Sequence, residues 1–167
     1  LQISSRGFGA NSTFGTRGIR LIVDNIPGTV ADGQGQISHI DLPSTDRIEV
    51  MRGPFSVLYG NSSGGVIRVF TQDGGPKTEV QPYFEVGSYG QRRAGLKASG
   101  KSDELGYVID AGQFHTNGYR DQSAADRRNA NAKLSFMGGP DTRITLIANN
   151  VSLRAEDPLG LNINQLI

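Results

Sequence analysis

From Glu79 onward, apolar and polar residues alternate with a period of two through five consecutive segments. The apolar members of these segments are Val80, Pro82, Phe84, Val86, Ala94, Leu96, Ala98, Tyr107, Ile109, Ala111, Ala130, Ala132, Leu134, Phe136, Ile144, Leu146 and Ala148. Because successive side chains of a strand point to opposite faces of its sheet, this period predicts five β-strands, each with one apolar face. The longest purely apolar runs, such as Leu21–Val23, are far shorter than the roughly 20 residues that a membrane-spanning helix needs. Any contact with a membrane is therefore expected through strands.

The connections between these five segments differ in length. Those at Ser102–Glu104 and Gly139–Asp141 are tight, whereas Gly118–Arg127 is longer and polar. Short and long connections that alternate in this way are typical of a transmembrane β-barrel. A soluble antiparallel sheet with one solvated face also produces alternation, so the strand pattern alone leaves both alternatives open.

The part of the chain before Gly75 has a different character, because glycine turns separate its short apolar runs. The full sequence of 167 residues holds 23 glycines, roughly twice the usual share. Strands are predicted at Leu21–Val23, Ile48–Met51 and Val66–Phe70, with one helical turn at Ser56–Tyr59. We therefore expect a compact α+β globule over about residues 3–72.

The change of pattern at Asp73–Pro76 predicts the domain boundary. Residues 1–75 are expected to form the α+β globule, and residues 76–167 the antiparallel strands.

Composition and motifs argue against several other classes of protein. The 17 basic and 16 acidic residues leave a net charge of +1, which does not indicate a nucleic-acid-binding protein. Cysteine is absent, and His39 and His115 lie far apart in sequence, so no metal site is predicted. The glycine-rich segment Tyr59–Gly65 lacks the lysine of a phosphate-binding loop. Nothing supplies a nucleophile or an activating base, so we predict neither an enzyme nor a cofactor.

One ordered set of motifs in the first half resembles the plug domain of TonB-dependent outer-membrane receptors, most closely those for ferric siderophores. The motifs are Arg6–Phe8, Arg17–Gly18, Leu21–Asp24, Ile26–Pro27, Arg47–Pro54, Leu58–Gly60 and Gly64–Ile67. The string from Arg47 to Gly65 is the most specific of them. The resemblance covers about residues 3–72 and continues into the strands at Gly118–Arg120.

The resemblance implies an α+β plug followed by the first strands of an incomplete transmembrane β-barrel, which has 22 strands in the family. It also implies a place in the bacterial outer membrane, in contact with its lipid. The receptor would bind a scarce extracellular ligand, an iron–siderophore complex above all, and import it when TonB moves the plug. The TonB-binding segment is expected upstream of this chain. The alternative is a soluble β-rich module that binds carbohydrates or surfaces; it has no reason to carry the Arg47–Gly65 string.

Two groups of site residues follow from the resemblance. Arg6 and Arg52 match the two plug arginines that pair with barrel glutamates, which suits the planar fork of arginine; bonds to local backbone carbonyls are the alternative. Two outward loops are candidates for ligand binding, and a solvated turn is the alternative for each. The loop residues are Asn11, Ser12, Thr13, Phe14, Thr29, Val30, Asp32 and Gln34.

Overall fold

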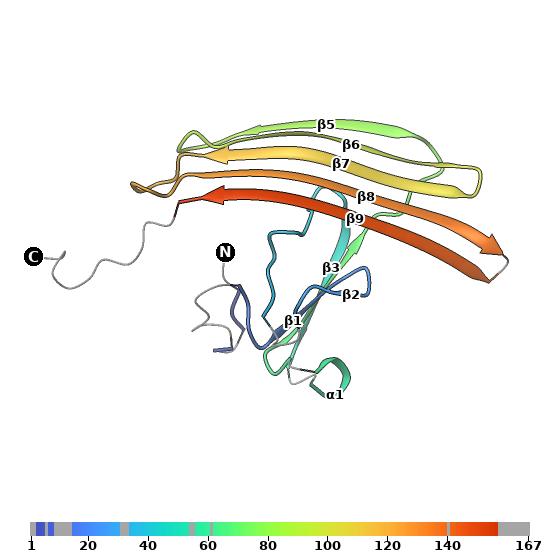
Figure 1. The fold of residues 1–167 in the computed structure, drawn as a ribbon, viewed down its shortest axis with the longest axis horizontal. Coiled ribbons are helices and arrows are strands. Elements are labelled where there is room, and N and C mark those ends of the chain that lie inside the picture. Colours follow the sequence, from blue (N-terminus) through green and yellow to red (C-terminus); the bar gives the residue numbers. More distant parts are fainter. Residues whose placement is uncertain are drawn as a thin grey trace, which may run out of the picture. The chain divides into compact units, whose positions relative to one another are not determined.

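The computed structural model describes residues 3–5, 7–8, 15–30, 34–53, 56–60, 62–139 and 141–156 (Figure 1). The chain divides into two compact units, Leu1–Asp73 and Gly74–Ile167. The first holds β1 (Ile19–Val23), β2 (Ile26–Pro27), β3 (Thr45–Arg52), α1 (Ser56–Tyr59) and β4 (Gly65–Thr71). The second holds β5 (Glu79–Val86), β6 (Arg92–Ser102), β7 (Leu105–Thr116), β8 (Ala125–Gly139) and β9 (Thr142–Ala155). Among the described residues, no helix has the length and apolar character needed to cross a membrane.

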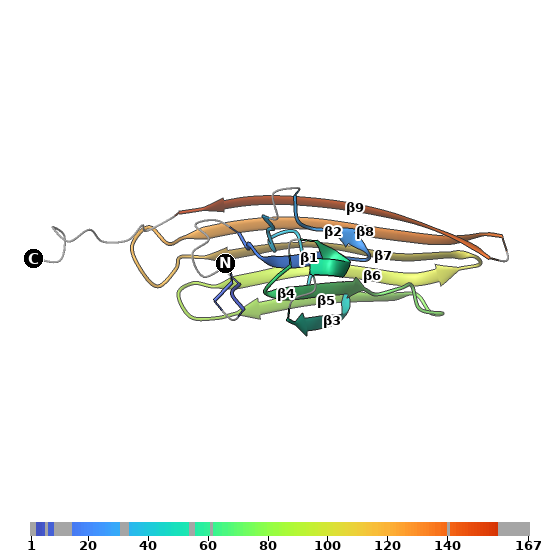
Figure 2. The ribbon, with the colours of Figure 1, turned by 90° about the horizontal axis from the view of Figure 1, so that it is seen from below.

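The first unit is built on a four-stranded mixed sheet in the order β2-β1-β4-β3 (Figure 2). Strand β1 runs parallel to β4, whereas β3 and β2 are antiparallel to their neighbours. The buried apolar side chains of this unit belong to β1 and β4 and are Ile19, Leu21, Ile22, Val66 and Val69. The three strands and the helical turn expected from the sequence are therefore confirmed, with β4 as the central partner of β1 and β3.

A tight turn at Asp24 and Asn25 joins β1 to β2 and fixes β1 to the far end of β4. Both residues have left-handed backbone angles, with φ of 46° and 67°, which Asp and Asn tolerate better than most residues. The Asp24 carboxylate accepts hydrogen bonds from the backbone N–H of Thr71, at 2.9 Å, and from the Thr71 hydroxyl. One side chain therefore connects segments that are 47 residues apart in sequence.

The second unit is a five-stranded antiparallel meander in the order β5-β6-β7-β8-β9. The five predicted strands are confirmed, but β6, β7, β8 and β9 extend further than the alternation indicated. The predicted long connection at Gly118–Arg127 is shorter than expected, because β8 already begins at Ala125. The shorter connections β6–β7 and β8–β9 lie at one end of the sheet, and the longer ones at the other (Figure 1).

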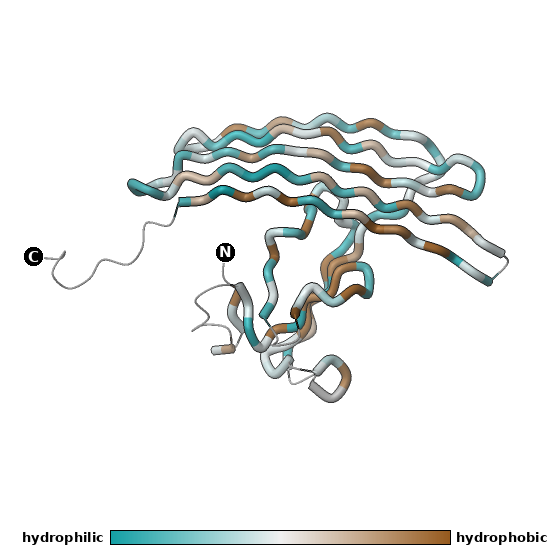
Figure 3. The backbone as a smooth tube through the Cα atoms, in the orientation of Figure 1, coloured by the Kyte–Doolittle hydropathy of each residue, from teal (hydrophilic) through white to brown (hydrophobic). Residues whose placement is uncertain are grey.

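Hydrophobic and hydrophilic residues alternate along the strands of this sheet (Figure 3), and the two faces differ accordingly. Apolar side chains on one face remain exposed, including Val80, Leu96, Ile109 and Leu146, which are 46–59% accessible. The other face carries buried polar groups, which are Lys97, Asp110, Asn131, Lys133 and Ser135. A soluble sheet buries its apolar face and solvates its polar one, so this arrangement is the reverse of a soluble sheet.

Replacing Asp24 with alanine is expected to loosen the junction between β1 and β4. The change removes the acceptor of two hydrogen bonds from Thr71 and should lower the local free energy of opening by about 1–3 kcal/mol. Amide hydrogen exchange of Thr71 in the full-length protein measures this. Asn25→Ala is the matched control, because it meets the same left-handed strain but loses only an exposed bond to Arg68. Equal exchange rates in the two variants would contradict the role of Asp24.

Candidate functional site

The second predicted ligand loop belongs to the first unit and lies between Thr29 and Gly35 in the sequence. The Val30 N–H donates to the carbonyl of Gln34 at 2.9 Å, which closes the loop at its base. Val30 is 62% exposed, Gln34 is half-buried and Thr29 is buried. Of these three candidates, Val30 therefore presents its side chain most openly to a ligand, and Thr29 packs inward.

The base of this loop leaves no space for a larger residue at Gly35. A Cβ atom there would lie 2.8 Å from Cγ2 of Thr29 and 3.0 Å from Cδ1 of Leu21. Backbone hydrogen bonds between Thr16 and Gly35, of 2.7 and 2.8 Å, bring the chain around residue 16 against the same point. Thr29 is therefore buried against Gly35 at the base of the loop.

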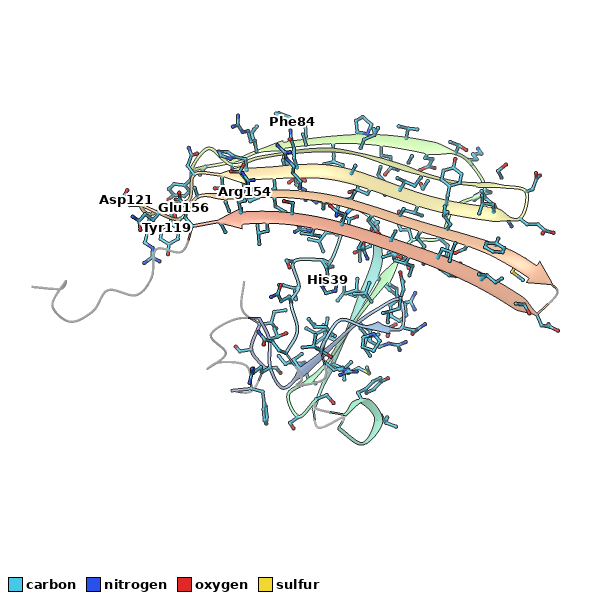
Figure 4. The ribbon with its side chains drawn as sticks, viewed as in Figure 1. His39, Phe84, Tyr119, Asp121, Arg154 and Glu156 are labelled. Carbon is cyan, nitrogen blue, oxygen red and sulfur yellow. The ribbon has the colours of Figure 1, made fainter. Side chains whose placement is uncertain are left out.

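The remaining ligand candidates cannot be placed. Asn11, Ser12, Thr13, Phe14 and Asp32 lie outside the described residues. His39, labelled in Figure 4, lies beside the start of the second loop, because a Cβ on Gly28 would be 3.1 Å from its Nε2 atom. Sequence reasoning did not include His39 among the loop residues.

Of the two predicted pairing arginines, Arg6 lies outside the described residues, and Arg52 is the last residue of β3. Arg52 is exposed and stands opposite Gly65 in the register of β3 and β4. Among the described residues, the structure gives Arg52 no ion pair or side-chain hydrogen bond. A role in pairing with residues outside this chain stays a prediction.

A different arginine cluster on β3 and β4 is satisfied within the first unit. Arg47 and Arg68 lie over the ring of Phe70, with their Cζ atoms 3.9 and 4.7 Å from its centre. Glu49 pairs with both, at 3.0 and 3.6 Å. The hydrogen bond to Glu49 is the main cause that raises the pKa of Arg47. This cluster stabilises the β3–β4 surface and needs no partner elsewhere.

On the buried polar face of the second unit, Tyr83 lies across two glycines of the neighbouring strands. A Cβ on Gly95 or on Gly112 would come within 2.2 or 2.3 Å of the Tyr83 side chain. The ring can therefore lie flat across three strands only because both positions are glycine. Its hydroxyl donates to Oδ1 of Asp110 at 3.3 Å, and Asn129 Nδ2 donates to the same oxygen at 3.3 Å.

Sequence reasoning missed this cluster of Tyr83, Asp110 and Asn129, although the sequence held a signal. Gly95 and Gly112 fall on the polar face at the same level as Tyr83, and glycines opposite an aromatic side chain mark such packing. The cluster joins β5, β7 and β8 through hydrogen bonds on the polar face. The described part of the chain contains no group of three or more His, Asp or Glu side chains that could hold a metal ion.

The two units are an α+β globule and an antiparallel sheet with an exposed apolar face. Residues 1–66 match the family model described as the TonB-dependent receptor plug domain. Over these residues the chain is similar to the plug domain of TonB-dependent receptors. This match and the likeness to the solved structures below confirm the expected fold, a plug followed by part of a barrel sheet.

Curated relatives extend the match beyond the plug. The chain is 34% identical to the ferric aerobactin receptor of Klebsiella pneumoniae over 84 residues, which are 50% of this chain and 11% of that protein. It is 28% identical over 179 residues to the iron-regulated outer membrane virulence protein of Vibrio cholerae, covering 95% of this chain and 26% of the relative. The second match therefore extends over both units of this chain.

Solved structures share the fold. The copper transporter OprC superposes with a TM-score of 0.69 at 20% identity, covering 92% of this chain and 26% of OprC. The ferripyoverdine receptor of the Pseudomonas aeruginosa outer membrane gives 0.69 at 20% identity, covering 90% of this chain and 20% of the receptor. The chain therefore spans about a quarter or less of the proteins that it matches here.

The Tyr83 cluster gives a test of the polar face in the full-length receptor. Tyr83→Phe keeps the ring over the glycines but removes the hydroxyl that donates to Asp110, and should lower the free energy of unfolding by about 1 kcal/mol. Urea unfolding in detergent measures it. The matched control is Tyr107→Phe, because Tyr107 bonds only to exposed Thr78 in the described structure, at 2.8 Å. An equal loss in both variants would contradict the importance of the buried cluster.

Proposed function

We propose that this chain is the plug and first barrel sheet of a receptor that binds a metal–siderophore complex outside the cell and imports it. On this proposal residues 1–75 are the plug domain, and residues 76–167 carry the first five strands of the barrel. TonB engages a segment upstream of this chain and moves the plug. The observation that carries the proposal is the plug-family match over residues 1–66, followed directly by a sheet with an exposed apolar face.

The class of ligand is supported by the relatives. They include receptors for ferric aerobactin and for metal–pseudopaline, and solved siderophore receptors share the fold. Iron is the expected metal because the iron-regulated relative covers 95% of this chain. None of these proteins is a soluble carbohydrate-binding module. Transport of this kind requires no covalent chemistry from the chain.

The sheet explains why strands and not helices would carry this chain through the outer membrane. In lipid every backbone N–H and C=O must be paired, and the ladders of β5 to β9 pair them in continuous register. Outer-membrane barrels have short turns on the periplasmic side and longer loops outside. On this pattern, the end that carries the β5–β6 and β7–β8 connections faces the exterior, where ligand arrives.

Growth under iron limitation tests the proposal. A strain that lacks its own siderophore receptors, complemented with the full-length gene, should grow with at least one ferric siderophore from a panel. The empty vector should not support growth. Growth should also disappear when TonB is deleted, because the plug then cannot be moved. Failure to grow with any siderophore of the panel would contradict TonB-driven siderophore import. Growth that persists without TonB would contradict it as well.

The proposed pairing of Arg52 with barrel glutamates predicts a distinct result. In the full-length receptor, Arg52→Ala should weaken the plug–barrel interface by about 3–5 kcal/mol if the pair is fully buried, because the glutamate partners remain unpaired. Limited proteolysis of the plug measures this. Arg52→Lys should restore only part of the protection, because lysine lacks the bidentate fork. Arg47→Ala is the control, since Arg47 pairs locally with Glu49; unchanged protection in Arg52→Ala would contradict the pairing.

A further inference from the structure

Three arginines gather on the exposed face of the second unit, at the end of the sheet that carries the longer connections. We call Arg92, Arg128 and Arg154 the arginine belt. The register places Arg92, His115, Asp126 and Arg154 in one row across β6 to β9, and Arg128 opposite Ser152 in the row beside it. Since neighbouring strands lie about 4.8 Å apart, the backbone positions of the belt fall within roughly 15 Å.

The belt surrounds a hollow on this face of the sheet. The hollow has a volume of about 480 Å³, and its lining includes the three belt arginines, Phe84, Gln113 and Ser152. In Figure 4 Phe84 and Arg154 lie toward the same end of the sheet, where Tyr119, Asp121 and Glu156 mark the edge formed by the loops. The hollow is thus lined mainly by polar and charged residues, together with Phe84 and Phe114.

The charged groups that line this hollow are predominantly cationic. Asp126 is the one carboxylate among its lining residues, and it pairs with His115 at 2.8 Å. Arg93 also contributes to the lining but pairs with Glu85 at 3.6 Å. By contrast, the structure gives the three belt arginines no ion pair or side-chain hydrogen bond among the described residues. Three guanidinium groups therefore lie available to an external anion.

The belt also lies directly beside the apolar part of the same face. Moving along the strands away from the belt, the outward rows become apolar from Leu96 and Ala111 onward, and continue through Ile109 and Val80. Two residues along a strand span about 7 Å. The face thus changes from lipid-compatible to cationic within one row of side chains, which is the spacing between the acyl chains and the headgroup of a lipid.

From this geometry we infer that the arginine belt binds the phosphate of a phosphorylated lipid headgroup in the outer leaflet. The guanidinium fork matches phosphate oxygens in paired hydrogen bonds. The acyl chains of the same lipid would pack on the neighbouring apolar rows, and Phe84 would lie at the border. A free anion in solution would gain the charge contacts but none of this apolar contact.

This inference rests on the proposed position of the sheet in the outer membrane, but not on the identity of the imported ligand. Loss of lipid binding with normal siderophore-dependent growth is the expected behaviour of a belt variant. The two proposals can therefore fail separately: the growth assay tests import, and a direct lipid assay tests the belt.

The test uses the full-length receptor in detergent and native mass spectrometry with lipid A as the probe. Wild type is compared with Arg92→Gln/Arg128→Gln/Arg154→Gln. The matched control is Lys77→Gln/Lys101→Gln/Arg143→Gln, which removes the same charge at the opposite end of the sheet. Basic residues near a membrane surface strengthen the binding of anionic lipid, so the belt variant should bind lipid A at least about tenfold more weakly. The control should bind as wild type does.

Two further probes distinguish a lipid phosphate from free phosphate as the bound anion. Dephosphorylated lipid A should bind wild type as weakly as lipid A binds the belt variant, and inorganic phosphate should not displace lipid A. If the triple variant does not show the heat-dependent gel mobility of a folded barrel, Arg128→Gln alone replaces it. A smaller loss of lipid A binding is then expected. Equal lipid A binding by wild type and belt variant, equal loss in the control, or displacement by inorganic phosphate would overturn the inference.

Discussion

The backbone ladder of β5 to β9 is the constraint on which the rest of this structure depends. Hydrogen bonding in register fixes which side chains share a row, and the two-residue period then assigns every row to one face. A slip of one residue would exchange the apolar and polar faces. The paired strands leave β5 and β9 as the edges of this sheet, and unpaired edges recruit further strands, which fits a sheet that continues in the rest of a barrel.

The same register gives the two faces of the sheet different surface chemistry. On one, Tyr83 lies over Gly95 and Gly112 and joins a polar cluster at Asp110, which gives a stiff polar surface. On the other, the exposed rows are apolar over most of their length and then become cationic near the longer loops. The polar cluster and the apolar and cationic rows therefore lie on opposite faces of the same strands.

Within the plug, the sheet depends on contacts between segments that are distant in sequence, which local sequence patterns do not predict. The parallel pairing of β1 with β4 joins segments more than 40 residues apart, and Asp24 strengthens it through Thr71. The loop at Val30–Gln34 is closed by a backbone bond, while Thr29 packs against Gly35. The sequence predicted a loop at this place but not the inward position of Thr29.

The sequence by itself determined the fold class, the five barrel strands and the three plug strands, because alternation and glycine turns are local signals of secondary structure. It did not reveal the full lengths of β6 to β9, because near their ends charged residues such as Arg128 and Arg154 lie on the outward face and the contrast between the faces disappears. Only the tertiary structure decided that Tyr83 meets Asp110 and that three arginines from different strands form one belt. Such groupings depend on register between strands, which no single segment encodes.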